Sequence, residues 1–318
     1  MRVLVTGATG FIGRALCPAL VAVGHEVAAV VRNSGNPGIP ERATVHVIPD
    51  IGPETEWDQP LSGTDAVIHL AARAHVMEEH ARDPLAEFNR INAEGTGRLA
   101  SAAAKAGIGR FVYLSTVKVM GDRSPAPFRE TDTPRPEDDY GKSKLAGERA
   151  LAEAAADTGL EPIILRPPLV YGPGAKGNFL ALMKLCQAAP PLPFSAVDNR
   201  RSIIYLGNLV DAIGRCLTAN GAAGETYFVR DGEDLSTPAL IRNVAAALGR
   251  PARLFPAPIG FLRLAGAITG KTQAISTLLS DLQVGDEKIR RQLGWTPSLN
   301  MLQGLKETAA WFSAAKKP

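Results

Sequence analysis

Short apolar runs alternate with amphipathic stretches along the first two thirds of the chain. The runs cover residues 2–6, 25–31, 65–72, 111–116 and 162–166. They are nearly continuous in apolar character, which is typical of strands buried on both faces of a parallel sheet. The stretches between them carry apolar residues at helical spacing. This alternation predicts an α/β fold with a doubly wound parallel sheet.

The remaining third is more irregular. Prolines and glycines interrupt residues 172–201, and strand character returns at residues 203–206 and 225–229. We therefore expect a smaller mixed α/β domain in the C-terminal part. The predicted division assigns residues 1–170 plus about 201–230 to a dinucleotide-binding Rossmann domain, and residues 171–200 plus 231–318 to a substrate-binding domain.

Composition narrows the class of protein. The net charge of +3 is spread along 318 residues, which argues against a nucleic-acid or polybasic membrane surface. Cys17, Cys186 and Cys216 are far apart and have no metal-ligand spacing, so we expect reduced thiols and no metal site. No segment has the pattern of a membrane span or a signal peptide. A cytoplasmic protein without a membrane partner is expected.

A glycine-rich turn follows the first predicted strand. Gly7, Gly10 and Gly13 are spaced G-x-x-G-x-x-G, and a helical pattern follows directly. Strand, glycine turn and helix in this order let a pyrophosphate approach the backbone at a helix N-terminus. The context favours dinucleotide binding over a purely structural turn, with Phe11 and Ile12 in the turn beside the cofactor.

The residues at the ends of the second and third apolar runs bear on the cofactor. NAD-binding sites place an acidic residue about 20 positions past the glycines, but this chain has Arg32 there. A guanidinium can pair with a 2′-phosphate, so NADP(H) is favoured and NAD(H) remains possible. A solvated arginine is the other interpretation. Leu70, Ala71 and Ala72 end the strand that contains His69, and small residues there leave room for a ligand, whereas His69 is expected to be a core residue.

Tyr140 and Lys144 lie four positions apart at the start of an alanine-rich helical run. Residues at this spacing share one helix face, and an ammonium beside a phenol favours the phenolate. The pair therefore predicts a general acid/base, although a surface pair has the same spacing. Ser115 and Thr116 end the fourth apolar run, where a hydroxyl can hold a substrate oxygen or cap a turn.

Taken together, these motifs resemble those of the extended short-chain dehydrogenase/reductases. The resemblance rests on the glycine turn, Asn92-x-x-Gly95-Thr96, Ser115-Thr116 and Tyr140-x-x-x-Lys144. The segments 165–173 and 293–297 are similar to those of the nucleotide-sugar epimerase/dehydratase branch. The match runs along the whole chain in the same order.

The resemblance implies a role for each matching residue. Tyr140 would be the acid/base at the sugar C4 oxygen, and Lys144 would hold the nicotinamide ribose and lower the tyrosine pKa. Thr116 would share the hydrogen bond to that oxygen, and Ser115 would line the cofactor side. The expected cofactor contacts are Gly7, Gly10, Phe11, Ile12, Gly13, Arg32, Leu70, Ala71, Ala72, Asn92, Ser115, Tyr140, Lys144 and Pro167.

The expected substrate contacts are Thr116, Lys118, Asn178 and Arg201. Arg201 matches a family arginine that contacts the substrate diphosphate. Two departures bear on which sugar is bound. Leu169 stands where the family often has an asparagine, and Val119-Met120-Gly121 replaces the common Val-Tyr-Gly.

These residues imply hydride transfer at C4 of a nucleotide sugar, most simply a UDP sugar. The leading expectation is an NAD(P)-dependent 4-keto reductase that acts on a 4-keto-6-deoxy sugar for polysaccharide biosynthesis. The alternatives are a UDP-sugar 4-epimerase that retains NAD and a non-catalytic NADP(H)-binding protein. A 4,6-dehydratase is disfavoured because Val117 and Lys118 replace its usual acidic pair. A homodimer could form through helices at residues 89–106 and 140–156.

Overall fold

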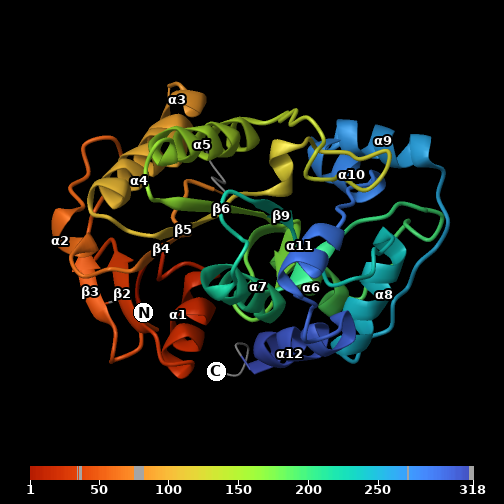
Figure 1. The fold of residues 1–318 in the computed structure, drawn as a ribbon. Helices are drawn as coiled ribbons and strands as arrows, with labels where there is room; N and C mark the ends of the chain where they lie inside the picture. Colours follow the sequence, from red (N-terminus) through yellow and green to blue (C-terminus); the bar gives the residue numbers. More distant parts are fainter. Residues whose placement is uncertain (34, 36–37, 75–81, 271, 315–318) are drawn as a thin grey trace.

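A seven-stranded parallel sheet forms the centre of the molecule in this computed structural model, which describes all residues except 34, 36–37, 75–81, 271 and 315–318 (Figure 1). The strand order is β3-β2-β1-β4-β5-β6-β9. The order reverses between β1 and β4, which creates the topological switch point of a doubly wound sheet. The strands are β1 Arg2–Thr6, β2 Glu26–Val31, β3 Thr44–Val47, β4 Ala66–His69, β5 Arg110–Leu114, β6 Glu161–Arg166 and β9 Thr226–Phe228. The predicted fold class is confirmed.

Helices cover both faces of this sheet, as Figure 1 shows. One apolar core joins the sheet to α1 (Gly13–Ala22), α7 (Leu206–Thr218) and α11 (Glu287–Leu293). A second core joins the opposite face to α4 (Gly95–Lys105) and α5 (Asp139–Ala155). The short α2 (Asp58–Leu61) adds Leu61 to that second core. Burial on both faces explains why the strands are apolar throughout.

The helix predicted around residues 88–106 has a break in its hydrogen bonding. It begins as α3 (Pro84–Asn89), where Asp83 caps the N-terminus by accepting from the Ala86 N–H at 3.0 Å. A π-helical turn, Arg90–Glu94, then leads into α4. Such turns widen the helix locally and are frequent at functional sites. Asn92 lies in this turn.

The C-terminal part has its own apolar core. The small parallel sheet of β7 (Leu169–Tyr171) and β8 (Ile203–Tyr205) packs with helices around Tyr171, Phe179 and Leu305. Ile203 and Tyr205 contribute to this core, although the predicted boundaries place them in the dinucleotide-binding domain. The helices are α6 Gly177–Ala188, α8 Thr237–Ala247, α9 Ile259–Ile268, α10 Thr272–Leu279 and α12 Met301–Ala314. Among the described residues, no helix has both the length and the apolar character needed to cross a membrane.

His69 is a hydrogen-bonded core residue, as expected from its apolar run. Its side chain is fully buried, with Nδ1 2.6 Å from Thr6 Oγ1 and Nε2 3.1 Å from Thr96 Oγ1. Thr96 Oγ1 donates to the Asn92 carbonyl, so it accepts from His69 Nε2–H, and Thr6 donates to Nδ1. This chain of bonds requires neutral imidazole. Burial lowers the pKa of His69 to about 3, and the Lys144 charge adds to this.

We expect His69 to make the protein acid-sensitive. The unfolded chain binds a proton on this residue near pH 6.5, whereas the folded chain binds it only near pH 3. The contribution of His69 to the free energy of unfolding is therefore complete above pH 6.5 and falls by about 1.4 kcal/mol per pH unit down to about pH 3. Urea unfolding across this range should show a shallower pH slope in His69→Gln than in wild type. His25→Gln, at a half-buried position outside this chain of bonds, is the control; equal slopes in wild type and His69→Gln would contradict the assignment.

Candidate active site

The predicted cofactor residues meet at the carboxyl edge of the sheet. The glycine turn follows β1, Leu70 to Ala72 follow β4, and Ser115 and Thr116 follow β5. Because β1, β4 and β5 are neighbouring strands, these three segments lie side by side at the switch point. Open α/β sheets bind their ligands in this place.

The glycine turn is suited to a dinucleotide. Gly7 has φ +67°, and a Cβ on it would lie 2.8 Å from the Ala71 nitrogen, so this position requires glycine. Gly10 is exposed, and Phe11 and Ile12 are half-buried at the start of α1. An exposed backbone without Cβ at a helix N-terminus can approach a pyrophosphate closely. The turn therefore fits the expected cofactor.

Arg32 lies just beyond the end of β2 and is exposed. An exposed guanidinium suits either a 2′-phosphate or solvent, so its position leaves both interpretations of the sequence open.

Tyr140 and Lys144 occupy the first turns of α5. The helix begins where the Asp138 carboxylate accepts from the Gly141 N–H at 2.7 Å. A Cβ on Gly141 would lie 2.7 Å from the Lys118 carbonyl oxygen, so glycine lets α5 approach the turn that begins at Thr116. The start of α5, which carries Tyr140 and Lys144, thereby packs against the turn that follows Thr116.

Lys144 is buried beneath the site. It is 1% exposed, and its Nζ lies 3.9 Å from the centre of the Tyr113 ring. Desolvation lowers the pKa of Lys144 to about 7, against the opposing charge of Glu148. The ammonium is therefore easily discharged.

The expected lowering of the Tyr140 pKa by Lys144 is not seen in this structure. Burial raises the pKa of Tyr140 to about 12, and the negative charge of Asp138 adds to this. The Lys144 ammonium does not offset this rise in the pKa. The resting phenol is protonated.

The two hydroxyls after β5 have different surroundings. Ser115 is buried, and its Oγ donates to Glu148 Oε1 at 2.5 Å. Thr116 is half-buried, and its Oγ1 accepts from the Lys118 N–H at 3.3 Å, which caps the 3-10 turn Val117–Val119. The Thr116 proton thus remains available for a substrate oxygen.

Sequence reasoning missed a buried ion pair behind the site. Arg166, at the end of β6, donates to both carboxylate oxygens of Glu148 at 2.9 and 2.5 Å. Their side chains are 7% and 5% exposed. The sequence does contain one signal for Glu148. Tyr140, Lys144 and Glu148 recur every four residues and therefore share one face of α5.

Asn92 connects the π-helical turn to two segments that border the site. It is fully buried; its Oδ1 accepts from the Arg73 N–H at 2.7 Å, and its Nδ2 donates to the Arg73 carbonyl and to Ser143 Oγ. These bonds tie the segment after β4 to α5. Pro167 is also buried, and its carbonyl accepts from the Val117 N–H at 2.9 Å. In this structure both residues hold the site's segments together.

The predicted substrate residues are spread more widely. The Lys118 ammonium pairs with Asp138 and, at 3.2 Å, with Asp122. Asn178 is exposed near the start of α6. Arg201 donates from Nη1 to the carbonyls of Thr277 and Ser280 at 2.9 and 3.0 Å, and burial lowers its pKa.

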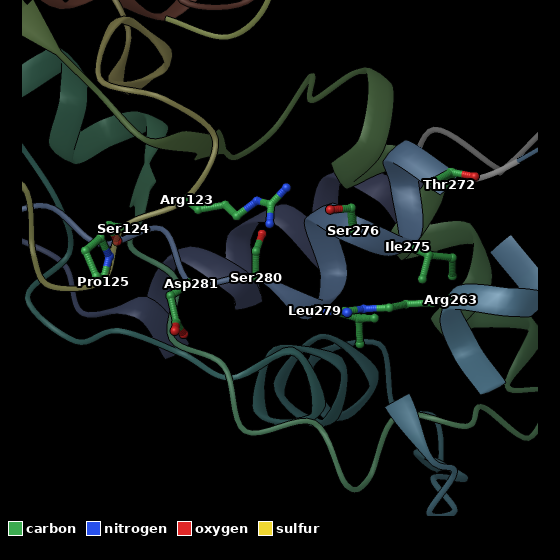
Figure 2. A pocket seen from close by; sticks show the side chains of 10 residues that line it. All are labelled: Arg123, Ser124, Pro125, Arg263, Thr272, Ile275, Ser276, Leu279, Ser280 and Asp281. Atoms are coloured by element: carbon green, nitrogen blue, oxygen red, sulfur yellow. The ribbon is translucent and has the colours of Figure 1, made fainter. Parts of the chain in front are cut away.

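A cavity of about 580 Å³ lies beside this last contact (Figure 2). Ser276 of α10 and Ser280, just beyond the end of that helix, line one part of the cavity. Arg123 and Arg263 are the cationic residues of the lining. Ser280 connects the cavity to Arg201. No motif in the sequence marked Arg123 or Arg263.

Known proteins are similar to this chain over nearly its whole length. Residues 3–229 match the model of the NAD dependent epimerase/dehydratase family. UDP-glucose 4-epimerase of Vibrio cholerae is 38% identical over 317 residues, covering 98% of this chain and 96% of the relative. N-acetyl-alpha-D-glucosaminyl-diphospho-ditrans,octacis-undecaprenol 4-epimerase of Escherichia coli O157:H7 is 29% identical and covers 99% and 97%. The structure of Thermus thermophilus UDP-glucose 4-epimerase in complex with NAD has a TM-score of 0.79 at 25% identity, with 99% and 100% covered.

Proposed function

The chain belongs to the NAD-dependent epimerase/dehydratase family, and we propose that it is a UDP-sugar 4-epimerase that retains NAD. The proposal is carried by the close approach of α5, which bears Tyr140 and Lys144, to the turn after Thr116 at the carboxyl edge of the sheet, where the glycine turn also lies. Both curated relatives described above are named for 4-epimerisation of a sugar carried on a diphosphate. They favour epimerisation over the 4-keto reduction that the sequence alone placed first.

When held at the glycine turn, NAD would supply the hydride acceptor for C4 and the hydride for the return step. The Thr116 hydroxyl donates to the C4 oxygen and fixes its position beside Tyr140. Tyr140 accepts the C4 hydroxyl proton as the carbonyl forms and gives it back as the carbonyl is reduced. Because burial raises the pKa of the resting phenol to about 12, oxidation of the C4 hydroxyl requires Tyr140 to have passed its own proton to solvent beforehand. Lys144 lies one helical turn further along α5, and in its charged form its ammonium would favour the phenolate.

Arg201 is proposed to anchor the diphosphate. A guanidinium matches phosphate geometry, and the burial of Arg201 strengthens its interaction with an anion. Its bonds to Thr277 and Ser280 hold the side chain at the end of α10. The sugar would then extend from this anchor toward Tyr140.

A single reduction of a 4-keto sugar remains the second candidate. A protonated resting Tyr140 suits donation to a keto oxygen, and Arg32 suits the 2′-phosphate of NADPH. Such an enzyme would exchange its cofactor at every turnover.

Incubation with UDP-glucose or UDP-N-acetylglucosamine, without added cofactor, tests the proposal. We expect the C4 epimer to form until equilibrium is reached, and bound NAD to be recovered when the protein is denatured. Stoichiometric oxidation of NADPH with a UDP-4-keto-6-deoxy sugar, and no epimer without cofactor, would instead establish the reductase. Cofactor binding without either reaction would indicate a non-catalytic protein.

A further inference from the structure

The outer face of α9 exposes an unusual density of apolar side chains. Phe261, Leu264 and Ile268 are 61%, 59% and 77% exposed and follow helical spacing along one face. Phe255 and Ile259, 46% and 45% exposed, extend the same region. These are five of the twelve large apolar side chains that are strongly exposed in the described chain. Clustered exposure of this kind marks an interaction surface.

The inner face of α9 already has its partner. Leu262 and Gly266 are buried, and a Cβ on Gly266 would lie 3.0 Å from Ile275 Cγ1 of α10. The two helices therefore pack through their inner faces. The outer face contributes nothing to that packing, so folding of the hairpin does not explain its apolar character.

The segment around α9 carries basic residues and no acidic ones. Residues 235–280 contain five Lys or Arg and no Asp or Glu, whereas the whole chain has a net charge of only +3. Arg253 and Arg263 are exposed near the apolar face. Two copies meeting through this face in a two-fold dimer would bring like charges together. The charge instead complements an anionic surface.

We propose that α9 docks on an anionic phospholipid bilayer. Phe261, Leu264 and Ile268 enter the boundary between headgroups and acyl chains, and Arg253 and Arg263 lie at the level of the phosphates. A helix of 10 residues lies on a bilayer rather than across it. This proposal departs from the expectation of no membrane partner, which was drawn from the net charge of the whole chain. Docking brings the cavity that contains Arg123 and Arg263 to the membrane surface.

Sedimentation with sucrose-loaded vesicles tests the proposal on the full chain. We expect wild type to bind phosphatidylcholine vesicles that contain about 30% phosphatidylglycerol, and to bind less at high salt. The variant Phe261→Ser/Leu264→Ser/Ile268→Ser should bind at least about tenfold more weakly. Val23→Ser/Leu302→Ser is the matched control, because its two positions are 72% and 61% exposed but lie at the C-terminal end of α1 and in α12; it should bind like wild type.

Arg253→Glu gives an independent readout should the apolar variant misfold, and it should also weaken binding. Thermal unfolding of each variant checks the fold. The proposal is overturned if wild type does not sediment with anionic vesicles, or if the triple variant binds as well as the control. It is also overturned if the triple variant turns a dimer into a monomer in analytical ultracentrifugation while neither form binds vesicles. Epimerase activity with UDP-glucose does not depend on docking, so the two proposals fail separately.

Discussion

Tyr140→Phe is expected to lower kcat by about 10²–10⁴-fold, the usual contribution of a general acid/base, and to leave cofactor binding nearly unchanged. The substitution removes one oxygen. The ring itself packs beside Phe88, with centroids 6.3 Å apart, and phenylalanine keeps that contact. The loss should therefore fall on proton transfer alone. Steady-state kinetics with the UDP sugar and a fluorescence titration of the cofactor measure the two effects separately.

Tyr227→Phe is the matched control. Its hydroxyl is buried in β9 and has no hydrogen-bond partner among the described residues, so its removal should change neither kcat nor cofactor affinity. Near-normal turnover in Tyr140→Phe would show that another group transfers the proton. A parallel loss of cofactor binding would show that the phenol acts in binding and not only in catalysis.

The fold and the positions of the main site residues were predictable because they depend on local patterns. Buried parallel strands give apolar runs, and the tight approach of Gly7 to Ala71 permits only glycine. Tyr140 and Lys144 share a helix face whatever surrounds them. These features depend on the spacing of residues along the chain, which a single sequence shows directly.

Features that depend on burial or on long-range contacts were not predictable. The pKa of Tyr140 depends on how desolvation compares with the charges nearby, and only the folded chain fixes that balance. The role of Asn92 depends on the bonds of its amide to Arg73 and Ser143, residues that only the folded chain brings beside it. Arg166 is 18 residues from Glu148, and no sequence rule pairs a strand-end arginine with a mid-helix glutamate.

Glu148→Gln is expected to lower the free energy of unfolding by about 3–5 kcal/mol, the usual cost of breaking a buried ion pair. The substitution leaves the Arg166 charge buried without a counter-charge, and Ser115 loses its carboxylate acceptor. The amide also presents two donors where the carboxylate offered only acceptors. Urea unfolding followed by circular dichroism measures the loss.

Two comparisons separate this charge effect from general damage to the core. Glu161→Gln breaks an ion pair with Arg110 in which the glutamate is 43% exposed, and exposed pairs contribute about 0–1 kcal/mol. Glu148→Leu/Arg166→Met removes both buried charges, so it should recover much of the stability lost in Glu148→Gln. If the double variant is less stable than Glu148→Gln, the hydrogen bonds of the pair matter more than its charge balance. A loss below about 1 kcal/mol in Glu148→Gln would contradict the burial that the structure assigns to Arg166.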